Sequence, residues 1–267
     1  MSARAIVRIG AAAAVVLAAI TFSAGTGEAH KAITSRYQFN EDVFPVVRDR
    51  CGRCHVDGGV APMSLMTFDD AAPWAESLRI ELLSDTTPAW HPLKLNAREL
   101  DLLLVWATGG APRGKPEHAP AVVPLVNAWG SGAPDVTLQV AKPFVLAGAT
   151  VEATSEVVLP IPARGARAIT AIDVLPGNPA MVRSATLLLK TPDGAARELA
   201  SWLPGQPAAV ALTSPVPVTE GAAIVARFVY KRTWKYEGQD LSDRSTVGLY
   251  YAAPAKKTAG RAAVPRP

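Results

Sequence analysis

The chain has 267 residues, which is long for one small domain and suits two modest domains after a leader segment. Hydrophobic residues make up 49% of it and charged residues 19%, which excludes a wholly disordered chain. The net charge is only +4 and the basic residues are scattered, so a nucleic-acid binder, which gathers Lys and Arg on one face, is not expected.

The first 29 residues have the pattern of a secretory signal peptide. Arg4 and Arg8 give a positive start, an apolar run from Ile9 to Ile20 follows, and small residues precede the end at Ala29. The apolar run is short for a membrane-spanning helix, which needs about 20 residues. We therefore expect a periplasmic or otherwise exported protein, cleaved after Ala29, with His30 as its first residue and no stable membrane span. Retention of the run as an anchor is the alternative.

Both cysteines of the chain lie in one pentapeptide, Cys51-Gly52-Arg53-Cys54-His55. The spacing C-x-x-C-H is the attachment signal for haem c. Two thiols one helical turn apart can each bond a vinyl group on one edge of the porphyrin, and the adjacent histidine then binds the iron as proximal ligand. We expect one covalent haem c, attached through Cys51 and Cys54 and ligated by His55.

Three other readings of the pentapeptide compete with haem. A redox-active disulfide would favour a thioredoxin-like βαβ context, whereas the flanking sequence has helical patterns. A zinc site would need two further ligands, but His30, His91 and His118 are dispersed singly. Chance occurrence of a short motif is the third reading. Export to the compartment where haem c is attached favours haem over all three.

Three helices are expected around the pentapeptide. The first spans residues 41–50, and the second starts at Thr67 or Asp69 as its cap and runs to about Ser84. The third is capped by Asn96, has Glu99 at the capping-box position, and ends at glycines 109 and 110. These helices predict a small all-α cytochrome c domain over residues 30–111.

The sequence indicates the second axial ligand of the iron less clearly than the first. Met63 and Met66 follow His55 closely, so little chain is left to pass around the ring edge, and Met66 is expected to fill the core instead. His91 lies in a proline-stiffened loop that can reach the opposite face, although it also fits an ordinary loop histidine. We name His91 as the expected distal ligand and Met63 as the alternative, with His118 more remote; an open sixth position is the third possibility.

The second half of the chain is predicted to be an antiparallel β-sandwich over residues 135–252, after a proline-rich linker at 112–134. A tail at 253–267 is expected to be disordered. Clusters of Pro, Gly and Asn separate the strand-like segments. These segments are Val136–Val140, Val151–Leu159, Ala168–Val174, Ala185–Leu189, Ala222–Tyr230 and Val247–Tyr251.

Several segments together resemble a known family. In the first half they are Asn40–Pro45, Arg50–His55, Gly58–Leu65, Pro73–Ser77 and Val105–Gly110, and in the second half Pro176–Arg183, Tyr230–Trp234 and Ser242–Tyr251. The chain resembles exported cytochrome c-like domains fused to a copper type II, ascorbate-dependent monooxygenase-like domain. The resemblance implies an α + β fold of two domains, a helical haem domain and a β-sandwich. Relatives commonly have Met-Pro-Pro-Trp where this chain has Thr87 to Trp90, and that methionine is the axial ligand the resemblance implies; threonine cannot replace it.

Copper activity is not carried over by the resemblance. Copper monooxygenase sites need several imidazoles, yet no histidine follows His118. Where copper-binding relatives have adjacent histidines, this chain has Val182-Arg183-Ser184, and Met181 is expected to pack in the core. A terminal His30 that chelates copper through its amine and ring is the one copper alternative, and it is the less favoured one.

The function expected from these features is electron transfer to or from a redox partner protein, with the sandwich as a docking or structural domain. The basic residues Lys231, Arg232 and Lys235 beside Trp234 and Tyr236 are a candidate docking surface; a solvated strand end is the other reading. The alternatives are a haem subunit of a larger oxidoreductase, or a haem enzyme with an open sixth position. An electron carrier is favoured over an enzyme.

Overall fold

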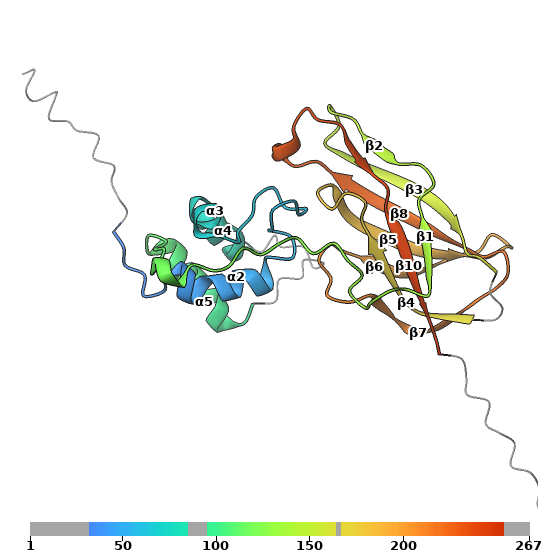
Figure 1. Ribbon diagram of the computed structural model, residues 1–267, viewed down its shortest axis with the longest axis horizontal. Coiled ribbons are helices and arrows are strands. Elements are labelled where there is room, and N and C mark those ends of the chain that lie inside the picture. The colour runs from blue at the N-terminus through green and yellow to red at the C-terminus, as the bar shows by residue number, and fades with distance from the viewer. Residues whose placement is uncertain (1–31, 85–94, 164–166, 254–267) are drawn as a thin grey trace, which may run out of the picture.

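The computed structural model describes residues 32–84, 95–163 and 167–253. The predicted signal peptide, His30, Thr87, His91 and all but the first residue of the predicted tail lie outside the described residues. Within them the fold is α + β, as expected: helices form the first part, and the strands of the second part pair only antiparallel. Figure 1 shows the helices gathered at one end of the molecule and the strands at the other.

The helical region begins with a π-helical turn, η1 (Phe39–Val43), that continues into α2 (Phe44–Arg50). The predicted helix over residues 41–50 is therefore present but starts two residues earlier and changes type. Pro45 is tolerated because it sits at the start of α2, where its missing N–H has no helical partner.

The second predicted helix is broken into three pieces, α3 (Phe68–Ala71), the 3₁₀ turn η2 (Ala72–Trp74) and α4 (Ala75–Leu83). Thr67, not Asp69, is its cap, because the Thr67 hydroxyl accepts a hydrogen bond from the backbone N–H of Asp70. The prediction of one continuous helix was wrong at Pro73, which supplies no N–H for the helical ladder.

The third helix, α5 (Ala97–Thr108), is confirmed in detail. The Asn96 side chain accepts from the Glu99 backbone, and the Glu99 carboxylate accepts from the Asn96 backbone, both at 2.9 Å. Gly109 is the C-cap, and Gly110 follows with a positive φ of 87°. The short 3₁₀ turn η3 (Pro116–His118) completes the helical region.

The β region contains ten strands in the described residues. Two four-stranded sheets have the orders β1-β10-β4-β7 and β3-β8-β5-β6, and β2 pairs with β9 alone. The strands are β1 (Val136–Gln139), β2 (Phe144–Leu146), β3 (Glu152–Pro160), β4 (Arg167–Leu175), β5 (Val182–Lys190), β6 (Ala196–Trp202), β7 (Val210–Val218), β8 (Ala223–Lys231), β9 (Leu241–Asp243) and β10 (Thr246–Tyr251). All six predicted strands are present within a few residues, and β2, β6, β7 and β9 were missed.

The described residues form two separate hydrophobic cores. One is helical, and its fully buried members include Phe39, Leu103 and Trp106. The other draws on strands of both four-stranded sheets, with Ile172 on β4 and Leu187 on β5 both fully buried. Each region therefore buries an apolar interior of its own, at a burial gain of roughly 25 cal/mol per Å² of apolar surface.

The segment predicted as a linker, residues 112–134, is held by both regions. The backbone N–H of Phe39 donates to the Pro112 carbonyl at 2.9 Å, and Leu125 packs on the helical core. Further along, the Asn127 amide donates to the Pro176 carbonyl at 2.9 Å. No helix among residues 32–84, 95–163 and 167–253 is long and apolar enough to cross a bilayer.

Candidate haem-attachment site

The pentapeptide forms a tight turn at the end of α2. Cys51 caps the helix and donates its N–H to the Val47 carbonyl at 2.8 Å. The Cys51 carbonyl then accepts from the N–H groups of both Cys54 (3.1 Å) and His55 (2.9 Å). A Cβ at Gly52 would lie 2.6 Å from the Arg48 carbonyl oxygen, so the turn closes because this position has no side chain. The two cysteines are consequently held one turn apart, as double attachment requires.

The two thiols are free and partly buried. Burial raises the pKa of Cys51 to about 11, and the neighbouring Cys54 thiol adds to the shift. Burial also raises the pKa of Cys54, against the opposing positive charges of Arg183 and Arg53. Redox-active C-x-x-C pairs work through a thiol whose pKa is lowered. This environment therefore disfavours the redox-disulfide reading of the pentapeptide.

His55 is oriented by the loop that follows it. Its Nδ1 lies 3.2 Å from the Met63 carbonyl oxygen, and a carbonyl only accepts, so Nδ1 carries the proton. In the neutral ring the lone pair is then on Nε2. A hydrogen bond from the other ring nitrogen to a carbonyl is the usual way in which a metal-binding imidazole is fixed.

The loop from His55 to Leu65 folds back on the pentapeptide. The Leu65 N–H donates to the His55 carbonyl at 2.9 Å, and the Ala61 N–H donates to the Cys54 carbonyl at 3.2 Å. A Cβ at Gly59 would come within 2.6 Å of the Cys54 carbonyl oxygen. These contacts place the Met63 carbonyl within hydrogen-bond distance of the His55 ring.

The donor set fits a haem better than a compact metal site. In the described ranges no three of His, Cys, Asp and Glu come together to hold a metal ion. Zinc would need thiolates and imidazole to converge on one point. In haem c the thiols bond the porphyrin edge while the histidine alone reaches the iron. The two partly buried thiols on one turn and the separately oriented imidazole match that arrangement.

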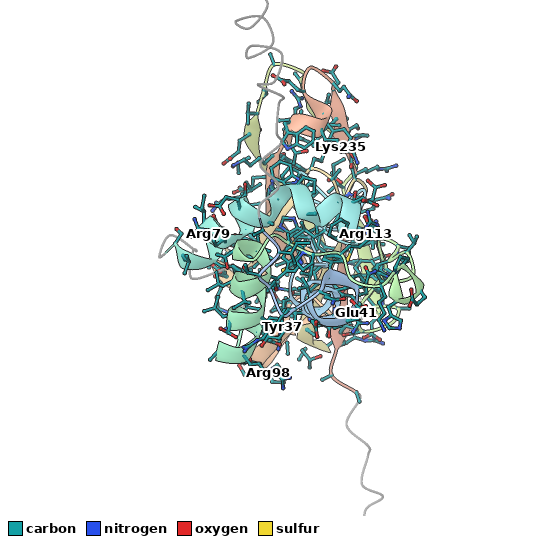
Figure 2. All side chains as sticks on the ribbon, turned by 90° about the vertical axis from the view of Figure 1, so that its left-hand side faces the viewer. Tyr37, Glu41, Arg79, Arg98, Arg113 and Lys235 are labelled. Carbon is teal, nitrogen blue, oxygen red and sulfur yellow. The ribbon has the colours of Figure 1, made fainter. Side chains whose placement is uncertain are left out.

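The other candidate iron ligands are placed differently. Met66 is 3% exposed in the helical core, as expected, while Met63 is partly buried beside it. His118 lies on η3 and its Nδ1 is 3.0 Å from Oε1 of Glu41, which Figure 2 labels. His91 lies outside the described residues.

The β region offers no imidazole, and its one sulfur candidate is structural. Met181 is 0% exposed in the core of the β region, as expected.

The predicted docking surface is corrected by the structure. Arg232 is buried, and its guanidinium donates to the carbonyls of residues 146, 147 and 148. Lys235, labelled in Figure 2, donates to the Asp57 carboxylate at 2.7 Å and so contacts the helical region of the same chain. Lys231 lies 3.6 Å from Glu152. Trp234 is 61% exposed, and the Lys231 and Lys235 side chains are exposed too, so the structure removes only Arg232 from the predicted surface.

Contacts between the two regions gather at the pentapeptide, and sequence reasoning missed them. Besides the Lys235–Asp57 pair, Gly205 in the loop between β6 and β7 lies against Arg53, and the charge of Arg183 on β5 acts on Cys54. No local signal in the sequence marks these residues, because the contacts depend on how β5 and the loops are arranged in three dimensions. A cavity of about 380 Å³ adjoins the same contact, lined by the loop at 56–64, by Trp74 and by residues 234–236.

No protein-family model matches the chain, and no curated protein matches it. The resemblance to cytochrome and copper-monooxygenase fusion proteins therefore stays a prediction from the sequence. Function is inferred from the pentapeptide, its hydrogen bonds and its contacts with the β region.

Proposed function

We propose that the protein is an exported, mono-haem c-type cytochrome that transfers electrons to or from a partner protein. The observation that carries the proposal is the geometry of the pentapeptide: two free, partly buried thiols on one turn, followed by an imidazole whose Nδ1 is held by the Met63 carbonyl. Cys51 and Cys54 would hold the porphyrin through thioether bonds, and His55 would ligate the iron. The bound haem supplies one-electron chemistry.

The same hydrogen bond bears on the distal ligand. The two nitrogens of an imidazole point to opposite sides of the ring, and the Met63 carbonyl contacts the one that faces away from the iron. Residue 63 would therefore lie on the same side of a bound haem as His55, and the Met63 side chain would have to pass around the porphyrin to reach the opposite face. This geometry supports His91 over Met63. His91 belongs to the connection between α4 and α5, separated from His55 by two helices.

We infer that the β region is a β-sandwich acting as a second domain. Support comes from the single core that residues of both four-stranded sheets share. The pairing of Lys235 with Asp57 favours a structural role toward the haem domain over docking by the basic residues of that segment. We propose that copper plays no part, since the β region has no histidine and Met181 is enclosed by apolar side chains.

The proposal is tested by visible spectra of the purified mature protein in both redox states, with and without carbon monoxide. An electron carrier with two axial ligands should give a low-spin reduced spectrum that carbon monoxide leaves unchanged. Rapid carbon monoxide binding would instead indicate an open sixth position and favour the haem-enzyme alternative. A purified protein without a haem spectrum would refute the proposal.

A further inference from the structure

The cavity of about 380 Å³ between the two regions is separate from the haem-attachment turn. Its walls come from the loop at 56–64, from α3 and η2 of the helical region, and from the 3₁₀ turn η4 (Trp234–Tyr236) of the β region. None of Cys51, Cys54 and His55 lines it. Small-molecule sites commonly have volumes of roughly 300–1,000 Å³ and are often found where two domains meet.

Aromatic side chains line this cavity from both regions. Trp74 comes from η2 and is partly buried against the helical core, whereas Trp234 and Tyr236 come from η4. Trp234 is 61% exposed. Aromatic rings offer apolar surface and an electron-rich face together, so they suit an organic cation as well as a neutral apolar group.

The charged groups of the lining favour a cation over a neutral group. Asp57, Asp69 and Asp70 contribute three carboxylates, and Lys235 is the one cation among the described lining residues. Asp57 pairs with Lys235 at 2.7 Å, and Asp69 pairs with Arg113. Asp70 has no ion pair within the part of the chain that the structure describes, so its charge is the one available to a ligand.

Lys235 shows how these surroundings hold an ammonium group. Its Nζ donates to the Asp57 carboxylate at 2.7 Å and lies 6.0 Å from the centroid of the Tyr236 ring, within the range of a cation–π contact. The hydrogen bond to Asp57 is the main reason why the pKa of Lys235 is raised. One ammonium is therefore already held in this cavity by a carboxylate and an aromatic ring.

Asp70 and Trp74 provide the same combination without an ammonium of their own. They are four residues apart along the continuous helical stretch of α3 and η2, so their side chains lie on one side of it. The Asp70 carboxylate accepts from the Thr67 hydroxyl at 2.8 Å through one oxygen, Oδ2. Oδ1 is left to accept from a ligand, with Trp234 lining the cavity from the other region.

We propose that this cavity binds a small organic ammonium ion, with the charged group at Asp70 and the apolar body between Trp74 and Trp234. Such an ion gains from the carboxylate and from the ring faces together, whereas the excess of carboxylates repels an anion. The proposal goes beyond electron transfer and does not depend on haem attachment, since no haem-attachment residue contributes to the cavity.

The test is isothermal titration calorimetry of the full-length protein with probes that share a phenylethyl body and differ in charge. Phenylethylammonium should bind, its neutral counterpart phenylethanol should bind severalfold more weakly, and the anion phenylpropanoate should not bind. Equal binding of the ammonium ion and the alcohol would show an apolar pocket without selectivity for cations and would overturn the proposal. Binding of the anion, or no binding of any probe, would overturn it too.

Variants locate the binding. Asp70→Asn should weaken phenylethylammonium about tenfold and leave phenylethanol nearly unchanged, because a charge-assisted hydrogen bond is replaced by one to a neutral amide. Trp234→Ala should weaken both probes severalfold. Asp101→Asn is the matched control, because Asp101 is an exposed carboxylate on α5 that pairs with Arg36 and does not line the cavity. An ammonium affinity that is unchanged in Asp70→Asn, or lowered equally in Asp101→Asn, would overturn the assignment.

Discussion

Three side chains of one turn carry the proposed chemistry at the scale of single residues. Burial raises the pKa of both Cys51 and Cys54, which favours the neutral thiol. His55 is fixed in one tautomer by its bond to the Met63 carbonyl. The spacing of the motif is enough to single out all three residues. The orienting Met63 carbonyl could not be predicted, because no residue type in the sequence indicates how the loop from His55 to Leu65 closes.

The double variant Cys51→Ala/Cys54→Ala should lose covalent haem completely, since no other cysteine exists in the chain. Haem staining after denaturing electrophoresis, together with extraction by acidified solvent, measures this directly. Arg53→Ala is the matched control within the same pentapeptide, because it leaves both thiols in place and should retain the haem. Haem that stays bound to the double variant under denaturing conditions would contradict the assignment.

Substitution of Asp173 tests a buried polar contact of the β region. Its carboxylate accepts from the Trp202 indole at 3.0 Å, and burial raises its pKa. Oδ1 of Asp173 also accepts from the Val174 N–H at 2.8 Å, and Oδ2 accepts from the Gly130 N–H at 3.4 Å. Asp173→Asn should be about as stable as wild type at pH 7, because the amide oxygen still accepts from Trp202 and Val174 and no charge is buried, while only the long bond from Gly130 is lost. Asp173→Leu should cost about 1–3 kcal/mol, because the Trp202 donor is left unpaired.

The pH dependence of the Asp173 variants has a definite sign. A raised pKa means that the folded protein binds the proton more readily, so wild-type stability should increase as pH falls through the range just above the ordinary aspartate pKa of about 3.9. The Asp173→Asn protein lacks this increase. Urea unfolding of both proteins from pH 7 to pH 4 measures the difference, and a wild-type stability that falls relative to the variant would contradict the account.

At the scale of helices and strands, an element is predicted accurately when the residues that stabilise it lie close together in the sequence. Helix α5 is marked by a capping box and two glycines within one short stretch, and its bounds were predicted closely. Strand β7 was missed because Pro215 and Pro217 read as a break; it is an edge strand, where missing N–H donors are tolerated. Strand β6 is also an edge and mostly exposed, and β2 and β9 have only three residues each.

Asn96→Ala should destabilise the helical region by about 1 kcal/mol, because it removes the side-chain acceptor of the capping box at α5. Asn96→Asp is the matched control, since a carboxylate caps equally well and also faces the positive end of the helix dipole. Thermal unfolding followed by helical circular dichroism measures the change. Equal stability of the Ala and Asp variants would show that the cap contributes nothing here.

At the scale of the whole molecule, the β region lies against the proposed haem site. The sequence predicted the two kinds of region and their order, but not the contacts of Gly205 with Arg53 and of Lys235 with Asp57. Those contacts depend on loop conformations that hydrophobic periodicity does not encode. The exposed Lys235–Asp57 pair contributes little energy by itself, so close packing at Gly205 is the more important contact.

Gly205→Ala should therefore weaken the contact between the two regions, in addition to straining the backbone. Gly205 has a φ of +69° and its Cβ would overlap Arg53, whereas Gly194 has a φ of +89° and open space around it. Both Ala variants should lose about 1 kcal/mol to backbone strain. Only Gly205→Ala should unfold the helical region and the β region at clearly different temperatures; identical behaviour of the two variants would contradict the interface.

The central claim, one haem bound covalently through Cys51 and Cys54, is tested most directly by the intact mass of the exported protein under denaturing conditions. The account predicts the mature chain plus the mass of one haem, with no free thiol left for alkylation. A mass equal to the bare chain, with two alkylatable thiols or with a disulfide between Cys51 and Cys54, would contradict it.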